Sequence, residues 1–182
     1  MKKYSNGVVV GRFQPFHKGH LDYVLKALKE TENLYIGITT PGKKPTQYEP
    51  VSPERFGKKN NPFTFKERKA MIAQSLLDEK IDLKRIKFVH YQPANTKSWF
   101  KKVPKNAVYF LLLLSQSEDV KVKAMQAQGL EVIVLETKSE RSHQGFDIRQ
   151  KILAGETWEN LVPMAVEKIL KKLDLLERLK IE

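Results

Sequence analysis

Five short apolar segments alternate along this chain with segments of helical period. The apolar segments, rich in β-branched residues, span residues 7–10, 34–39, 85–91, 107–114 and 130–136. Between the first two, apolar residues from Leu21 to Leu28 recur at positions i, i+3, i+4 and i+7, which is one face of a helix. Strands that alternate with helices run parallel, because each helix carries the chain back along the sheet. The sequence therefore predicts an α/β fold, a five-stranded parallel sheet with helices on both faces.

Residues that begin and end helices mark the rest of the chain. Thr64 and Glu67 have the spacing of a capping box, which predicts a helix through about Leu77. The prolines and glycines between residues 41 and 62 predict a long loop before that helix. Other helices are predicted at residues 118–128, ended by Gly129, at residues 147–154, ended by Gly155, and in one last stretch that begins near Pro163.

The composition limits the class of protein. The length of 182 residues fits one domain, and we expect residues 1–182 to form it, including a C-terminal helical segment at 157–182. Cysteine is absent, which excludes disulfides and thiolate metal sites and fits a cytoplasmic protein. The longest apolar run, residues 108–114, is too short to span a bilayer, and no secretory signal pattern is present. We therefore expect a cytoplasmic location and no membrane partner.

The net charge of +12 is compatible with nucleic acid or with a phosphate-rich small substrate as the partner. Lysines are scattered along the chain, which favours a solvated surface over a binding stripe. Nucleic acid is therefore not the partner that we expect.

The stretch that follows the first apolar segment, GRFQPFHKGH (residues 11–20), concentrates groups suited to phosphate. Ligands of parallel sheets bind beyond the carboxyl ends of the strands, which is where this stretch lies. If a helix begins near Gly19, its first N–H groups form an anion site, and Arg12 beside it offers a planar fork for phosphate oxygens. His17 and His20 are three residues apart, so both rings lie on one side of a helical turn and can donate to a polyphosphate.

Two other interpretations of the histidine pair stay open. One is a zinc site, for which His90, His143 or a carboxylate would supply the third ligand. The other is a polar turn without a chemical role.

Three blocks of the sequence resemble one family in the expected order and spacing. VVVGRFQPFHKGHL (residues 8–21) is similar to the first motif of the HxGH nucleotidyltransferases, and specifically of the archaeal-type nicotinamide-nucleotide adenylyltransferases. NPFTFKERKAMI (61–72) is similar to the next block of that family, and IRQKILAGETWENLVPMAVEKI (148–169) to its closing block. A match of three blocks is more specific than a lone H-x-G-H.

The resemblance implies a Rossmann-like domain and a set of site residues. Arg12, His17 and His20 match residues that hold the phosphates of ATP, and Arg149 matches the arginine that binds the triphosphate tail. Further nucleotide-binding positions are Gly11, Phe13, Gln14, Gly19 and Ile148. Trp99 matches a tryptophan that lies against the nicotinamide ring, although a core or surface-hinge tryptophan is an equal alternative. Mg²⁺ accompanies ATP, and no side chain of the protein is expected to ligate a metal.

The sequence departs from the family pattern at two places near the nucleotide. The family carries S-G-T or S-A-T before its I-R pair, where this chain has Gln144, Gly145 and Phe146, and Gln144, Ser142 or His143 would have to replace the missing hydroxyls. The family's T-G-N turn after the fourth strand is replaced by LLLLSQSED (residues 111–119). The loop at 41–61 is also longer than usual, and its basic residues would suit a lid or a solvated loop; they are Lys43, Lys44, Arg55, Lys58 and Lys59.

The resemblance implies transfer of the AMP moiety of ATP to a mononucleotide, with release of pyrophosphate. Nicotinamide mononucleotide, giving NAD, is the expected acceptor, and the protein is expected to be a homo-oligomer. Two alternatives remain: an adenylyl- or cytidylyltransferase for another phosphorylated acceptor, and a nucleotide-binding homologue with weakened catalysis. An RNA-binding module is a lesser alternative, because no second motif of the tRNA synthetases is present.

Overall fold

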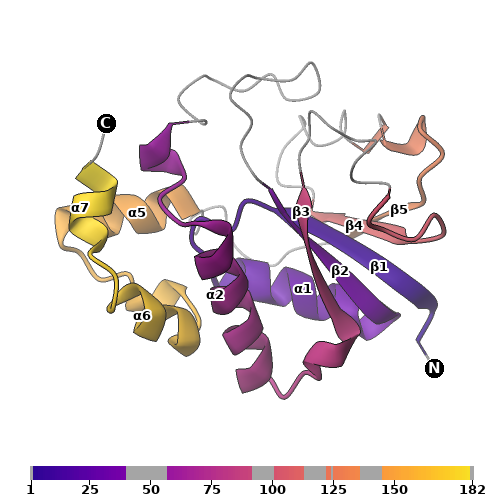
Figure 1. Cartoon of the computed structure of the whole chain (residues 1–182), viewed down its shortest axis with the longest axis horizontal. Helices are drawn as coiled ribbons and strands as arrows, with labels where there is room; N and C mark the ends of the chain where they lie inside the picture. The colour runs from indigo at the N-terminus through magenta and orange to yellow at the C-terminus, as the bar shows by residue number, and fades with distance from the viewer. Residues whose placement is uncertain are drawn as a thin grey trace.

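A five-stranded parallel sheet forms the centre of the molecule (Figure 1). The computed structural model describes residues 2–39, 57–91, 101–112, 122–123, 125–135 and 145–180. The strands are β1 (Tyr4–Gly11), β2 (Thr31–Thr39), β3 (Ile86–Tyr91), β4 (Val108–Leu112) and β5 (Val132–Leu135). They are arranged in the order β3-β2-β1-β4-β5, with every neighbouring pair parallel. The predicted five-stranded parallel sheet is confirmed.

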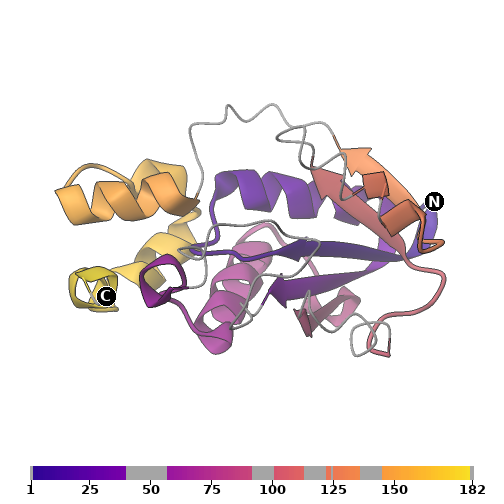
Figure 2. The ribbon, with the colours of Figure 1, turned by 90° about the horizontal axis from the view of Figure 1, so that it is seen from above.

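Helices cover both faces of this sheet, as predicted. Helix α1 (Lys18–Glu30) lies on one face and α2 (Phe65–Asp78) on the other, which is clear in the view from above (Figure 2). Three further helices, α5 (Gly145–Ala154), α6 (Met164–Leu170) and α7 (Leu175–Lys180), gather beyond one end of the sheet in both views. The short 3₁₀ segments are η2 (Lys58–Asn60), η3 (Leu83–Arg85) and η4 (Glu159–Leu161).

The sheet forks at its centre, between β1 and β4. Strands β1 and β2 pair at seven positions, up to Gly11 opposite Ile38. Strands β1 and β4 pair at only two positions, Gly7 opposite Val108 and Val8 opposite Tyr109. From β1 the chain continues to β2 and β3 on one side of β1, and then to β4 and β5 on its other side. The strand order therefore reverses at the fork, and parallel sheets bind ligands at such a topological switch point. At the carboxyl end of β1, pairing with β2 therefore continues after pairing with β4 has ended.

The capping box that opens α2 is present as predicted. The Thr64 Oγ1 accepts a hydrogen bond from the Glu67 N–H at 3.2 Å, and the Glu67 carboxylate accepts one from the Thr64 N–H at 2.8 Å. Arg178 of α7 then donates to the same carboxylate at 2.7 Å. These bonds and the nearby Arg178 charge lower the pKa of Glu67 against the opposing effect of its burial. The start of α2 is thus tied to the end of the chain.

The C-terminal segment corrects one prediction. The sequence predicts one helix from Pro163, but α6 ends at Leu170 and a second helix, α7, begins at Leu175. Pro163 is the N-cap of α6 and does not lie in its first turn. The break has a local cause, because Asp174 Oδ1 accepts a hydrogen bond from the Glu177 N–H at 3.3 Å. An aspartate that caps a new helix competes with continuation of the old one.

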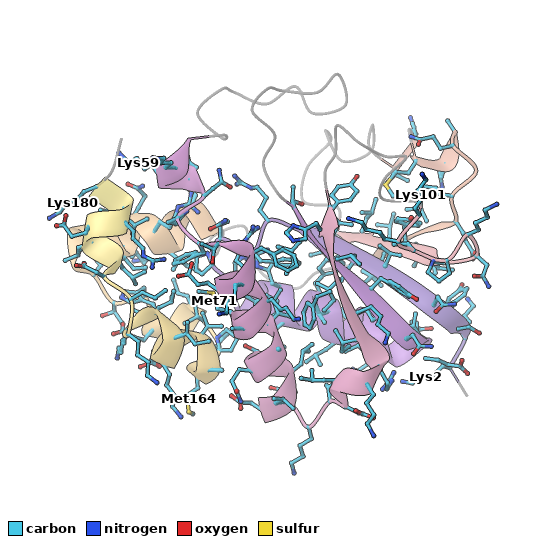
Figure 3. All side chains as sticks on the ribbon, in the orientation of Figure 1. Lys2, Lys59, Met71, Lys101, Met164 and Lys180 are labelled. Carbon is cyan, nitrogen blue, oxygen red and sulfur yellow. The ribbon has the colours of Figure 1, made fainter. Side chains whose placement is uncertain are left out.

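Lysine side chains are spread over the molecule. Those labelled in Figure 3 range from Lys2 at the N-terminal end to Lys59 and Lys180 at the opposite end. Of the helix predicted at 118–128, only parts lie within the described residues, and Gly129 follows them with a φ of 75°. No helix of the described residues is long and apolar enough to cross a membrane.

Candidate active site

The loop between β1 and α1 is held in an unusual conformation by its own aromatic residue. Phe13 has a φ of 54°, in the left-handed region that bulky residues rarely adopt, and its side chain is fully buried. The Phe13 ring lies against Gly11, where a Cβ atom would approach the ring to 2.6 Å. Gly11 is thus needed to make room for Phe13. Strain of this kind persists at functional sites because the surrounding structure holds it.

Gln14 ties this loop to the second sequence block. Its side-chain Nε2 donates to the Phe63 carbonyl at 3.0 Å, and its Oε1 accepts from the Phe63 N–H at 3.0 Å. The Gln14 side chain is buried, so both hydrogen bonds are shielded from water. The first block of the resemblance and the NPFT segment therefore form one unit in space.

His17 and His20 lie together at the N-terminus of α1, as the spacing predicts. Their rings stack with centroids 3.5 Å apart. His17 is the N-cap of the helix, and its Nδ1 accepts a hydrogen bond from the His20 N–H at 3.3 Å. A neutral His17 therefore carries its proton on Nε2, which is the atom that can donate to a ligand. The N–H groups of Lys18 and Gly19 precede the first intrahelical hydrogen bond and add to the donors at this helix end.

His20 is held in its neutral form. Its ring packs between Phe13 and Phe16, and its Nδ1 is enclosed without a hydrogen-bond partner among the described residues. Burial lowers the pKa of His20 well below its ordinary value, and the charges of His17 and Arg12 lower it further, whereas the Pro15 backbone acts in the opposite direction. A buried polar nitrogen without a partner requires an explanation, and such groups are found most often at functional sites.

Arg149 reaches the same loop from α5. Its Nη1 donates to the Gln14 carbonyl at 2.6 Å and its Nη2 to the Asn60 Oδ1 at 2.7 Å. The side chain is buried, and burial together with the Arg12 charge lowers its pKa to about 10. Gly145, at the start of α5, allows this approach, because a Cβ there would lie 2.6 Å from the Gln14 carbonyl oxygen. Packing therefore explains Gly145, which matches the glycine of the family's S-G-T pattern.

A pocket of about 370 Å³ opens beside Arg149, between η2, α5 and α7. Lys59 and Asn60 line one side, and Phe146, which is 52% exposed, lines another. The Arg149 guanidinium lies 5.8 Å from the centre of the Phe146 ring. A flat aromatic surface beside two cationic side chains is suited to an anionic ligand that carries a ring.

Arg68 is a site residue that the sequence reasoning missed. From α2, its Nη1 donates to the Arg12 carbonyl at 2.7 Å and to the Thr39 carbonyl at 2.8 Å. Its burial and the Arg12 charge lower its pKa to about 10. Among the described residues, neither Arg68 nor Arg149 forms an ion pair with a carboxylate. The one sequence feature that could have indicated Arg68 is its position within the second block of the resemblance, NPFTFKERKAMI (61–72).

The structure brings several of the predicted site residues together, and their roles stay predictions. Arg12, His17, Gly19 and His20 lie around the start of α1, and Arg149 approaches them through Gln14. The side chains of Phe13, Gln14 and Ile148 are buried, so their predicted role in nucleotide binding stays a prediction that would involve backbone atoms. Trp99, Gln144, Ser142 and His143 lie outside the described residues, as do LLLLSQSED from residue 113 and most of the 41–61 loop.

The alternative of a zinc site finds no ligand set among the described residues, which do not include His143. His90, at the end of β3, stacks on Phe65 with ring centroids 3.7 Å apart. In the ranges that the structure describes, no cluster of three or more His, Asp or Glu side chains could hold a metal ion.

A family model described as cytidylyltransferase-like matches residues 8–151. This range includes the strands on both sides of the fork, the histidine pair and Arg149. The chain belongs to the cytidylyltransferase-like family. It is a nucleotidyltransferase, and the resemblance of its sequence to the HxGH nucleotidyltransferases is confirmed.

Relatives of this cytidylyltransferase-like protein act on different substrates. It is 33% identical over 176 residues to a phosphonoformate cytidylyltransferase of Streptomyces viridochromogenes, with 97% of this chain and 96% of the relative covered. It is 32% identical over 180 residues to a nicotinamide-nucleotide adenylyltransferase of Thermoplasma acidophilum, with 98% of this chain and 92% of the relative covered.

The fold is also found among solved structures. The bifunctional NMN adenylyltransferase/ADP ribose pyrophosphatase of Francisella tularensis, in complex with AMP and a manganese ion, matches with a TM-score of 0.69 at 21% identity. The match covers 97% of this chain and 52% of that one, so the present chain spans about half of the bifunctional protein. The Rossmann-like fold expected from the sequence is confirmed.

Proposed function

We propose that this protein joins the AMP moiety of ATP to nicotinamide mononucleotide, giving NAD and pyrophosphate. The observation that carries the proposal is the cluster of Arg12, His17 and His20 at the N-terminus of α1, beside the fork of the sheet. The archaeal relatives and the three-block resemblance support ATP and nicotinamide mononucleotide as the substrates. The predicted contact of Trp99 with the nicotinamide ring is part of this proposal.

The reaction is an in-line displacement at phosphorus. A phosphate oxygen of the acceptor attacks the α-phosphorus of the nucleotide, and the bond to the bridging oxygen of the β-phosphate breaks. That oxygen leaves with the electron pair as part of pyrophosphate, so no proton transfer or covalent enzyme intermediate is required. Negative charge builds on the leaving phosphates during this step.

The residues of the chain act by holding those phosphates. The Arg12 guanidinium, the His17 Nε2–H, the His20 ring and the N–H groups at the start of α1 supply donors where the charge builds. Arg149 orients the loop through the Gln14 carbonyl and contributes positive charge from α5. Mg²⁺ would be carried by the phosphates of the nucleotide and would neutralise part of the developing charge.

A second candidate is cytidylyl transfer from CTP to a small acceptor that carries a phosphate or phosphonate. The similarity to the phosphonoformate cytidylyltransferase over nearly the whole chain favours it. Phe146 supports it as well, because an exposed aromatic ring stands where the adenylyltransferase pattern has a hydroxyl. Phosphonoformate is the acceptor to test first with CTP.

The test is a matrix of nucleotides and acceptors with pyrophosphate release as the measurement. ATP and CTP are each combined with nicotinamide mononucleotide, phosphonoformate and a panel of phosphorylated acceptors, in the presence of Mg²⁺ or Mn²⁺. Release with ATP and nicotinamide mononucleotide supports the first proposal, and release only with CTP supports the second. Binding of nucleotide without any release identifies a weakened homologue. Size-exclusion chromatography of the same sample tests the predicted homo-oligomer.

A further inference from the structure

Arg68 links the backbone of β1 and β2 just beyond their last residue pair. The last residue pair of these strands is Gly11 with Ile38, and Arg12 and Thr39 follow it. A single atom, the Arg68 Nη1, donates to the carbonyl oxygens of both, at 2.7 Å and 2.8 Å. Arg68 thus holds the backbone of Arg12 at a fixed distance from the end of β2.

The Arg68 side chain is itself held firmly. Its Nε donates to the Thr64 carbonyl at 3.3 Å, one turn earlier in α2, and that turn is fixed by the capping box. Only 3% of Arg68 is exposed. Burying a cation without a carboxylate partner is unfavourable, and the three carbonyl oxygens offset only part of that penalty. A neutral donor would satisfy the same carbonyl groups, so the charge itself requires a separate explanation.

We propose that Arg68 is a positioning residue for nucleotidyl transfer. It fixes the backbone of Arg12, and so aims the Arg12 guanidinium at the nucleotide phosphates, while its own charge adds to the positive potential of the site. This inference rests on the proposed function, which assigns Arg12 to those phosphates. Displacing a catalytic group by about 1 Å can lower a rate about 100-fold, so a residue that sets the position of Arg12 has a large effect on turnover.

The chain provides a matched control in Arg85. From η3, the Arg85 Nε donates to the Glu32 carbonyl at 2.7 Å, and its Nη2 donates to the carbonyl oxygens of Thr31 and Leu28 at 2.8 Å and 3.4 Å. Arg85 therefore holds backbone carbonyl groups at the amino end of β2, as Arg68 does at the carboxyl end. Only Arg68 holds the backbone of Arg12.

The experiment compares Arg68→Lys with Arg85→Lys. Each change keeps the charge and removes the planar fork. Arg85 is less buried than Arg68, so packing alone predicts a larger loss of melting temperature in Arg68→Lys, and the two variants are compared by their activity at a temperature where both are folded. We expect kcat for pyrophosphate release to fall by about 10-fold to 100-fold in Arg68→Lys, with a smaller change in the KM of the nucleotide. We expect kcat of Arg85→Lys to stay within about 2-fold of the unmodified protein. If Arg68→Lys melts below the assay temperature, Arg68→Gln replaces it.

A double-mutant cycle with Arg12→Ala separates positioning from general disruption. If Arg68 acts through Arg12, Arg68→Lys lowers kcat by less than about 3-fold when Arg12 is already alanine. An equal loss in both backgrounds, or no loss in the single variant, overturns the inference. If the unmodified protein releases no pyrophosphate, the proposed function fails, and the cycle is then measured on the Kd of ATP and CTP. If Arg68→Lys weakens nucleotide binding less when Arg12 is already alanine, the inference holds. If the two substitutions raise Kd independently, it is overturned.

Discussion

Replacing Gln14 with methionine removes both hydrogen bonds to the Phe63 backbone while the side chain keeps nearly the same length. The Phe63 N–H and carbonyl group then lose partners that are each 3.0 Å away, at a site where Gln14 is only 3% exposed. A buried donor or acceptor left without a partner costs about 1–3 kcal/mol, so the two together predict a loss of about 2–6 kcal/mol in the free energy of unfolding. For a domain of this size, that corresponds to a melting temperature lower by roughly 10 °C.

Calorimetry and urea unfolding of Gln14→Met measure this loss. Gln74→Met is the control, because Gln74 is exposed and donates to the Asp78 carboxylate at 3.3 Å on the same helix. That control should change the free energy of unfolding by less than about 0.5 kcal/mol. A loss below about 1 kcal/mol in Gln14→Met, equal to that of the control, would refute the argument that Gln14 joins the two sequence blocks.

Three further predictions concern the loop and its neighbours. His20→Ala should lower kcat by about 10²–10³-fold, and near-normal turnover would contradict the role of His20 in holding phosphate. Because the pKa of His20 is lowered in the folded state, the unfolded chain binds the proton first as the pH falls below about 6.5, so stability should fall between pH 7 and pH 5. His20→Asn should show a smaller fall in melting temperature over that range, and an unchanged slope would be evidence against the buried neutral imidazole. Gly145→Ala should destabilise the protein by about 1–3 kcal/mol, since the new Cβ would lie 2.6 Å from the Gln14 carbonyl oxygen; an unaltered melting temperature would show that α5 can shift freely.

Local patterns predicted the local structure well. The five strands, the parallel sheet and the capping box of Thr64 and Glu67 follow from periodicities and spacings that involve only neighbouring residues. The prediction of one helix from Pro163 was wrong because the cap at Asp174 was overlooked. Its D-L-L-E spacing resembles that of the correctly predicted capping box at Thr64 and Glu67. Such errors concern boundaries and leave the order of elements intact.

Contacts between distant segments could not be predicted in the same way. Gln14 and Phe63 are 49 residues apart, and their two hydrogen bonds depend on how the loop and the start of α2 meet in space. The buried position of Arg68 likewise depends on where two strands end beside a helix. No periodicity distinguishes a surface arginine on a helix from one that reaches two carbonyl groups. Sequence patterns therefore located the site, while its internal support required the fold.

The fork between β1 and β4 gives this protein a modular design. Two residue pairs join the two sides of the sheet; Arg12, His17 and His20 lie in the β1–α1 loop and the start of α1, and Arg149 reaches that loop from α5, which follows β5 in the chain. The segments in which the sequence departs from the adenylyltransferase pattern follow β4 and β5 in the chain. We predict that mutations in those segments change the choice of nucleotide or acceptor while Arg12, His17 and His20 keep their places. The same division offers a route to redesign, in which exchange of the segments after β4 and β5 between relatives alters specificity without rebuilding the catalytic half.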